Sequence, residues 1–317
     1  MKLTLEDVRS RFIKHFDGAT GSVYASPGRI NLIGEHTDYN NGYVFPGAVE
    51  QGIIAELRPN GTNTVDLYSI DYKDRVQFDL NDTEGPRATW ARYIYGVCRE
   101  MMALGVKVAG FNAAFAGDVP LGAGMSSSAA LESCFAFALN DLFAGGGIAP
   151  MELARVGQRT EHKYVGCNCG IMDQFASVHG KKGSLMRLDC RSGEFEYFPW
   201  APKGYQLVLV NSCVKHELVG SPYNERREAC EQAAAIIAKR YPDVQTLRDA
   251  TMEMLEAVKA ELTEEQYKRA QYVIGEMERV LAVCDALKAG DYERVGTMMY
   301  ATHEGLSKAY EVSCEEL

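Results

Sequence analysis

The sequence predicts an α+β protein of two domains. Its 317 residues, of which 46% are hydrophobic and 24% charged, are enough for a real core and exceed the usual length of one domain. Short β-rich segments alternate with helical ones over the first two thirds, and long charged helices fill the rest. Because the composition shifts near residue 203, we expect an N-terminal domain over residues 1–202 and a C-terminal domain over residues 203–317.

Short apolar segments predict the strands. Short apolar segments between turn residues indicate strands at 43–45, 52–57, 65–70 and 75–80, with a turn at residues 71–74, and together they predict an antiparallel sheet. Phe111 to Phe115 returns to period two after a helix, which indicates a further strand. Leu207 to Val210 is continuously apolar, a pattern typical of a buried strand.

The helices follow from spacings of three and four. Trp90, Ile94, Val97 and Met101 predict a helix over 90–104. A second helix after Gly122 ends at three glycines, residues 145–147, and a third is expected over 151–164. The charged helices of the last third are expected at about 225–240, 264–287 and 292–307.

Charge and cysteine content exclude several classes of function. With 33 Lys and Arg against 43 Asp and Glu, the net charge of −10 argues against general affinity for nucleic acid or anionic membranes. Glu6 and Asp7 stand where a signal peptide needs an apolar stretch, so we expect a cytoplasmic protein. The nine cysteines form no CxxC pair and are expected to be reduced. Cys167 and Cys169 lack the further ligands at suitable spacing that a metal site needs.

Three polar clusters carry the candidate chemistry. In the first, Arg29, Glu35, His36 and Asp38 crowd into one segment, and burying such groups costs several kcal/mol unless each finds a partner. A polyhydroxylated ligand would supply partners. A solvated loop ending in the turn Asp-Tyr-Asn-Asn-Gly explains the segment equally well.

The second cluster joins a predicted strand to a predicted helix at residues 119–132. Gly122 and Gly124 let a ligand approach the backbone, and the serines that follow offer hydroxyls and N-cap oxygens where a helix start favours phosphate. Met125-Ser126 replaces the lysine of a Walker A loop. A serine here can hold Mg²⁺ if a carboxylate joins it. The alternative is a Gly/Ser loop that caps an ordinary helix.

The third cluster places Glu161 and Asp173 on either side of a turn. Glu161, at the end of a helix, could reach a metal, and Asp173 could accept or orient a hydroxyl proton. The alternative for Asp173 is an ordinary acid at a helix N-terminus.

Taken together, the clusters resemble the galactokinase family of the GHMP small-molecule kinases. The resemblance covers almost the whole chain and includes Gly220-Ser221-Pro222-Tyr223 and the final Tyr-Glu-Val-Ser-Cys segment. It implies a two-domain GHMP kinase fold with an N-terminal mixed α/β domain and a ferredoxin-like C-terminal domain. The family carries a third glycine-rich motif beyond that final segment, and the sequence stops at Leu317 before it. We therefore expect an incomplete C-terminal domain and a truncated sequence.

The resemblance also implies roles for single residues. Asp173 receives or orients the proton of the anomeric hydroxyl, two roles that stay open, and Arg29 holds that acid ionised and stabilises charge on the transferred phosphoryl group. Ser128 and Glu161 would hold Mg²⁺. The sugar would bind at Glu35, His36, Thr37, Asp38, Gly170 and Tyr223. The ATP phosphates would bind at Gly122, Ala123, Gly124, Met125, Ser126, Ser127 and Ser128.

The implied function is ATP-dependent phosphorylation of the anomeric hydroxyl of α-D-galactose to galactose 1-phosphate. We expect a monomer with galactose and ATP as its small-molecule substrates and no nucleic-acid or membrane partner. One alternative is a kinase for a related sugar such as N-acetylgalactosamine, although Thr37 fits galactokinases better because those relatives tend to carry Ile there. The other is a non-catalytic galactose and ATP sensor, but such sensors lose residues of the serine loop, which is intact here.

Overall fold

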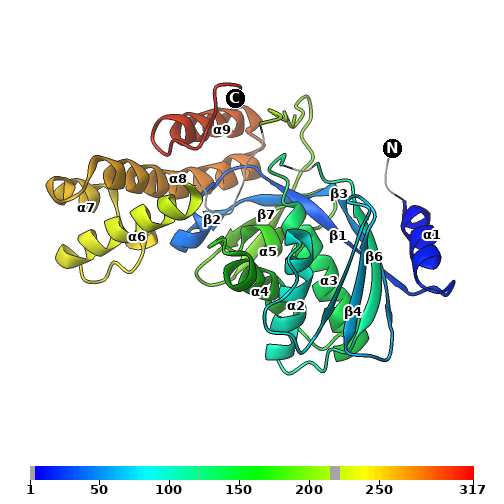
Figure 1. Ribbon diagram of the computed structural model, residues 1–317. Coiled ribbons are helices and arrows are strands. Elements are labelled where there is room, and N and C mark those ends of the chain that lie inside the picture. Colours follow the sequence, from blue (N-terminus) through cyan, green and yellow to red (C-terminus); the bar gives the residue numbers. More distant parts are fainter. Residues whose placement is uncertain (1–3, 121, 215–221) are drawn as a thin grey trace. The chain divides into compact units, whose positions relative to one another are not determined.

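A computed structural model describes residues 4–120, 122–214 and 222–317 (Figure 1). Leu121 of the predicted phosphate loop, Gly220 and Ser221 of the run before Tyr223, and the first three residues lie outside the described residues. The chain divides into two compact units. The first comprises Met1–Arg29, Ala48–Cys169 and Asp173–Gly180, and the second comprises Ile30–Gly47, Gly170–Met172 and Lys181–Leu317. These bounds differ from a division at residue 203, which stays a prediction.

A five-stranded sheet of order β1-β3-β6-β4-β5 is the framework of the first unit. Its β4 and β5 form the expected hairpin around the turn at 71–74, and β3 pairs antiparallel with β6. The prediction that the strands between residues 43 and 80 form one antiparallel sheet is wrong, because Tyr43–Val44 belongs to a different sheet. The further strand, β6, lies between β3 and β4 and runs parallel to β4. Between β4 and β6 the chain passes through β5 and helix α2, Thr89–Ala103, a connection long enough to bring β6 beside β4 in the same direction. The strands are β1 Ser22–Asn31, β3 Pro46–Pro59, β4 Thr64–Ser69, β5 Asp74–Asp79 and β6 Phe111–Gly117.

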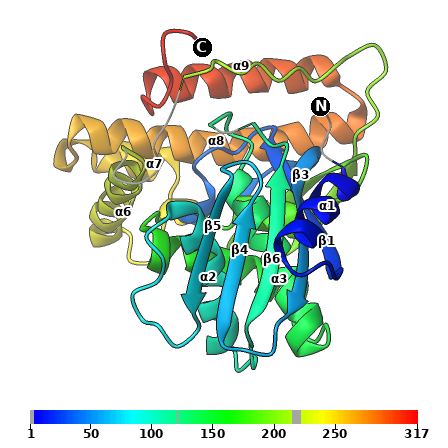
Figure 2. The same ribbon diagram turned by 45° about the vertical axis from the view of Figure 1, so that its right-hand side comes forward.

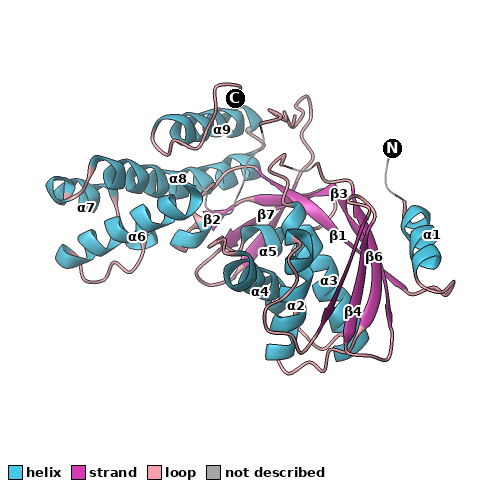
Figure 3. Cartoon of the chain, in the orientation of Figure 1, coloured by secondary structure: helices cyan, strands magenta, loops and turns pink. Residues whose placement is uncertain are grey.

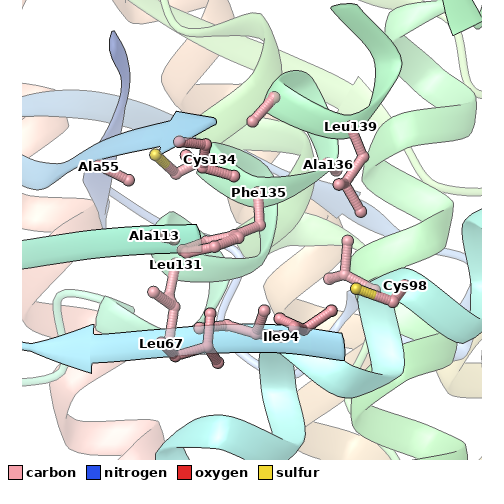
Figure 4. Close-up of a cluster of buried hydrophobic side chains, with 14 of the residues drawn as sticks. Ala55, Leu67, Ile94, Cys98, Ala113, Leu131, Cys134, Phe135, Ala136 and Leu139 are labelled. Atoms are coloured by element: carbon pink, nitrogen blue, oxygen red, sulfur yellow. The ribbon is translucent and has the colours of Figure 1, made fainter. Parts of the chain in front are cut away.

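Both faces of this sheet are covered. Ala113 and Phe115 of β6 point into the main core, which helices α2 and α3 complete with side chains such as Ile94 and Phe135 (Figure 4). Ala114 points the other way, as alternation along a strand requires, and packs with Phe12 and Phe16 near helix α1. Helix α1 lies on that opposite face (Figure 2).

Helices α2, α3 and α4 of the first unit agree with the three predicted there, whereas no helix was predicted over the residues of α1. Helix α3 ends where Gly145 adopts a left-handed conformation with φ 58°, the usual role of glycine after a helix. Helix α4 begins with Pro150 at its first turn and continues into a π-helical turn, Glu161–Val165. The bounds are α1 Leu5–His15, α2 Thr89–Ala103, α3 Ser127–Ala144, α4 Pro150–Thr160 and α5 Met172–His179.

The second unit combines a three-stranded sheet with a helical layer (Figure 3). Its strands β2 Tyr43–Val44, β7 Ser184–Asp189 and β8 Phe195–Pro199 pair antiparallel in the order β2-β7-β8. Phe45 and Ile33 share a core with Val280 and Val283 of α8. The helices are α6 Pro222–Arg240, α7 Met252–Ala257, α8 Glu264–Ala289 and α9 Tyr292–Lys308, with short 3-10 turns at Asp38–Asn40, Leu247–Asp249 and Lys259–Glu261.

The predicted buried strand at Leu207 to Val210 is wrong. These residues form no strand, and Val208, Leu209 and Val210 are 68%, 56% and 78% exposed. A strand needs a neighbour for its backbone groups, and none of the described strands pairs with this segment.

All nine cysteines are free thiols. Within residues 4–120, 122–214 and 222–317, no helix is long and apolar enough to cross a membrane.

Candidate active site

In the first unit, β1 and the loop before α3 are held against each other at Arg29. The Arg29 backbone N–H donates to the Met125 carbonyl at 3.1 Å. A Cβ atom on Gly28 would lie 2.6 Å from the same carbonyl oxygen, so only glycine fits beside the loop. The Pro-Gly-Arg sequence therefore brings the Arg29 side chain to the predicted phosphate loop.

The two predicted catalytic residues form an ion pair. Arg29 Nε donates to Asp173 Oδ1 at 2.7 Å, and another nitrogen of the same guanidinium donates to the Gly124 carbonyl. Ser126 Oγ donates to Asp173 Oδ2. The side chains of Arg29 and Asp173 are 12% and 29% exposed, so the pair is largely desolvated while the carboxylate can still meet a ligand. One acid thus ties together β1, the serine loop and α5.

The loop itself has an unusual backbone. Gly122 and Gly124 are left-handed with φ 73° and 70°, which glycine adopts without cost. Ser126 is left-handed as well, with φ 54°, and occupies the N-cap position of α3, but its side chain does not cap the helix. The expectation that this serine supplies an N-cap oxygen is wrong, because its hydroxyl is bound to Asp173. Ser127 begins the helix, and Ser126, predicted as a phosphate ligand, also orients the acid.

The two predicted magnesium ligands also meet. Ser128 Oγ donates to Glu161 Oε1 at 3.0 Å, joining the first turn of α3 to the π-helical turn after α4. Burial, followed by the nearby Asp173 carboxylate, raises the pKa of Glu161 to about 7. Glu161 therefore exchanges its proton near neutral pH.

This pair fits the ligand preference of Mg²⁺, which takes one or two protein oxygens and completes its shell with water and substrate phosphates. Among the described residues there is no group of three or more His, Cys, Asp or Glu side chains that could hold a metal without other ligands. The donors present thus suit a cation that arrives with a phosphate.

Gln174 and Glu132 form a buried pair that no sequence pattern indicates. Gln174, next to Asp173 on α5, donates from Nε2 to Glu132 Oε2 of α3 at 3.0 Å, and both side chains are fully buried. Burial, followed by the nearby Glu161 carboxylate, raises the pKa of Glu132 well above its usual range. The contact fixes α5 against α3.

In the second unit, the predicted sugar segment is a tightly bonded turn. Asn31 Nδ2 donates to Glu35 Oε1 at 2.9 Å, while Asn31 Oδ1 accepts the Phe45 amide at 3.1 Å, so this carboxylate is oriented by the strand before it. The Thr37 side chain is fully buried, and its hydroxyl lies 2.9 Å from the Gly34 carbonyl and 2.6 Å from that of Tyr43. Thr37 holds the turn closed.

His36 stands at the centre of an aromatic group. Its backbone is left-handed with φ 64°, a conformation that costs a non-glycine residue about 1–2 kcal/mol. Its ring lies 5.4 Å from that of Tyr223, and the Tyr39 and Tyr223 rings are 5.5 Å apart. Burial, with the charge of Arg226, lowers the pKa of His36 to about 4. The structure thus brings together His36 and Tyr223, two predicted sugar-binding residues 187 positions apart in the sequence.

Asp38 and Gly170 also meet. A Cβ atom at Gly170 would overlap the Asp38 carboxylate, so glycine is required there. Asp38 is 9% exposed, and its Oδ1 accepts the Tyr39 amide at 3.0 Å. The structure therefore brings together two pairs of predicted sugar-binding residues, His36 with Tyr223 and Asp38 with Gly170.

Helix α8 supports this turn through residues that no sequence motif identified. The buried Glu276 carboxylate accepts the Gly34 amide at 2.8 Å, and it is itself bound by Thr302 and Arg279. Tyr272 Oη donates to the Glu35 carbonyl at 3.2 Å. Their positions in a long amphipathic helix gave no sign of these contacts, because they join residues about 240 positions apart.

Two family models and a solved structure identify the fold. Residues 92–181 match the model of the N-terminal domain of GHMP kinases, and residues 10–59 match the galactose-binding signature of galactokinases. The fold also resembles Methanococcus jannaschii mevalonate kinase, with a TM-score of 0.57 at 16% identity over 95% of this chain and 82% of that one. The chain therefore has the fold of the GHMP kinases.

More similar relatives define the family. The galactokinase of Thermotoga neapolitana is 40% identical over 92% of this chain and 79% of its own length. That of Chloroflexus aurantiacus is 37% identical over 99% and 80%. The crystal structure of Lactococcus lactis galactokinase complexed with galactose matches with a TM-score of 0.94 at 34% identity, over 99% of this chain and 82% of that one. The chain belongs to the galactokinase family, and the predicted two-domain GHMP fold is confirmed.

Proposed function

We propose that this chain phosphorylates the anomeric hydroxyl of α-D-galactose with ATP and releases galactose 1-phosphate and ADP. Membership of the galactokinase family supports the reaction and both substrates. The observation that carries the mechanism is the arrangement around Asp173, with Arg29 on one carboxylate oxygen and Ser126 on the other.

Phosphoryl transfer needs little covalent help from a protein, so positioning and charge stabilisation lower most of the barrier. Arg29 carries a fixed positive charge at the phosphate loop and stabilises negative charge on the transferred group. The same guanidinium holds the Asp173 carboxyl group in place through the ion pair. Each carboxylate oxygen has two lone pairs, so Asp173 keeps acceptor capacity for the anomeric hydroxyl after binding Arg29 and Ser126. It either orients this hydroxyl or takes its proton.

The phosphates of ATP are assigned to the loop from Gly122 to Ser128. Left-handed glycines expose backbone amides, and the start of α3 adds the positive end of a helix dipole. Ser128 and Glu161 would hold Mg²⁺ beside these phosphates. When bound, the ion neutralises part of the phosphate charge.

Galactose is assigned to Glu35, His36, Asp38, Gly170 and Tyr223. Carboxylates accept hydrogen bonds from sugar hydroxyls, while Gly170 leaves room beside Asp38 and Tyr223 offers an aromatic face. Thr37 belongs to this segment as a support, since its hydroxyl is bound to the backbone.

An ADP-release assay across sugars tests the proposal. We expect turnover with galactose and little with N-acetylgalactosamine, glucose or arabinose. A preference for N-acetylgalactosamine would favour the related kinase. Binding of galactose and ATP without ADP release would favour the sensor, which the intact serine loop argues against.

We also propose a cytoplasmic monomer that binds neither nucleic acid nor membranes. The net charge of −10 supports the absence of both partners. Light scattering coupled to size-exclusion chromatography should give the mass of one chain, and a mass of two would exclude the monomer.

A further inference from the structure

A chain of hydrogen bonds runs from His36 into the core of the second unit. His36 Nδ1 lies 2.8 Å from Tyr39 Oη, which lies 2.7 Å from Tyr310 Oη. Tyr310 Oη lies 3.3 Å from Cys230 Sγ. Tyr310 and Cys230 are fully buried, so the chain leads away from solvent.

The direction of these bonds follows from the acidity of the groups. A phenol is a stronger hydrogen-bond donor than a neutral imidazole N–H, and an unprotonated imidazole nitrogen is a stronger acceptor than a phenol oxygen, so the stronger of the two possible bonds is donated by Tyr39 to His36 Nδ1. Once Tyr39 gives its single proton to His36, the bond between the two phenols must be donated by Tyr310. The Cys230 thiol is then the donor to Tyr310, a weak bond that sulfur can make.

The protonation states agree with this direction. Burial raises the pKa of Tyr39 and Tyr310 well above their usual range and that of Cys230 to about 11, so all three keep their protons. Burial lowers the pKa of His36 to about 4, so its ring is neutral and carries a single N–H.

We propose that Tyr39, Tyr310 and Cys230 fix His36 as the tautomer protonated at Nε2, so that His36 meets galactose only as a hydrogen-bond donor. This inference rests on the proposed binding of galactose at His36. Glu35 and Asp38, as carboxylates, only accept hydrogen bonds, so a donor-only His36 completes the set: a sugar hydroxyl can donate to a carboxylate and accept from the imidazole. Tyr39 and Tyr310 are thus positioning residues for the sugar.

The geometry restricts the His36 ring in other ways too. The Tyr310 ring packs 4.6 Å from it, and Asn40 Nδ2 donates to the His36 carbonyl at 3.0 Å. Arg226 Nε donates to the Tyr310 carbonyl at 3.2 Å and so holds the backbone that carries this ring. With ring and backbone both held, a tautomer set by Tyr39 presents Nε2–H in one direction.

Nitrogen NMR of the ¹⁵N-histidine-labelled full chain, without galactose, reads the tautomer directly. The His36 signals are identified by their loss in His36→Gln. We expect an unprotonated Nδ1 and a protonated Nε2. A protonated Nδ1 would overturn the proposal, and this measurement needs no variant of the tyrosines to fold.

Two variants then test the chain. Tyr39→Phe removes the donor to Nδ1, and we expect a mixed tautomer and a rise in the KM for galactose of about 3- to 10-fold, with kcat and the KM for ATP within about 2-fold. Tyr310→Phe leaves Tyr39 in place and should raise the galactose KM by only about 2-fold. Tyr267→Phe is the matched control, because Tyr267 packs on the same core but bonds to Glu256 instead.

The outcomes separate this proposal from the proposed function. Unchanged tautomer and galactose KM in Tyr39→Phe would overturn the positioning role. If the wild-type chain shows the expected tautomer and loses it in Tyr39→Phe but never binds galactose, the proposed substrate fails and the proton arrangement stands.

Discussion

The residues around Asp173 and those around His36 differ in charge and in how they are held. In the first unit, Arg29, Asp173 and Glu161 concentrate charge at a loop with little side-chain bulk. In the second, a neutral imidazole lies among tyrosines, and its turn is held by Thr37 and Glu276. Charge is needed where a phosphoryl group is transferred, whereas a sugar is recognised by donors and acceptors in fixed directions. Substitutions in the first group should therefore act on turnover, and those in the second on affinity.

The largest effect is expected for Asp173→Asn. The variant keeps the size of the side chain but loses the charge that pairs with Arg29 and the capacity to take a proton. We expect kcat to fall by about 10²- to 10⁴-fold, with galactose binding still measurable by calorimetry.

Asp66→Asn is the control for this prediction. Asp66 also pairs with an arginine, Arg75, at 2.6 Å in the same unit, so its substitution reproduces the loss of an Asp–Arg ion pair without touching the proposed site. Turnover near the wild-type level in Asp173→Asn would exclude Asp173 from the reaction.

Local sequence patterns predict some features of these two units, but they do not predict contacts between distant residues. The hairpin at 71–74 and the end of α3 at Gly145 were predictable, because turn residues and helix stops act over a few positions. The Arg29 and Asp173 positions were recognised through family motifs. Tyr39 and Tyr310 lie 271 positions apart, so no local pattern indicates their contact.

Two predictions from the sequence are wrong for physical reasons. Leu207 to Val210 has the composition of a buried strand, but a strand also depends on its neighbours. Ser126 stands at the N-cap position, where a serine hydroxyl usually accepts a hydrogen bond from the backbone of the helix. Here its hydroxyl donates to the Asp173 carboxylate instead, and Asp173 lies 47 positions away in the sequence, so no local pattern indicates the contact.

The next largest effect is expected for Asp38→Ala, which probes the second group. Loss of a carboxylate that accepts sugar hydroxyls should raise the Kd for galactose by about 10- to 100-fold, since hydrogen bonds to charged groups contribute about 1.5–3 kcal/mol. The Kd for ATP should stay within about 2-fold, because Asp38 is assigned to the sugar alone.

Calorimetric titrations with each ligand measure both constants. Asp189→Ala serves as control, because Asp189 lies in the same unit and pairs with Arg248 at 3.1 Å. Unchanged galactose affinity in Asp38→Ala would mean that the segment around Asp38 is structural.

The smallest effect, on stability, is expected for Glu161→Gln in buffer without Mg²⁺. The pKa of Glu161 is raised to about 7, so the folded chain holds this proton more tightly than the unfolded chain, whose glutamate has a pKa near 4.5. The stabilisation that follows is fully present below pH 4.5 and is lost as the pH rises through 7. The wild type should therefore lose unfolding free energy between pH 5 and pH 8 relative to Glu161→Gln, by on the order of 2 kcal/mol.

Urea unfolding followed by fluorescence measures this difference in the unit that contains Glu161. Trp90 lies in the first unit and Trp200 in the second, so a Trp200→Phe background leaves Trp90 as the reporter. Glu152→Gln, at an ion-paired glutamate of α4, is the control and should follow the wild type at every pH. Because a bound cation favours the ionised carboxylate, Mg²⁺ with an ATP analogue should restore the wild type at pH 8 more than the variant. Parallel pH curves for wild type and Glu161→Gln would mean that the pKa of Glu161 is not raised in the folded chain, and the contrast between the charged group around Asp173 and the neutral group around His36 would lose its clearest support.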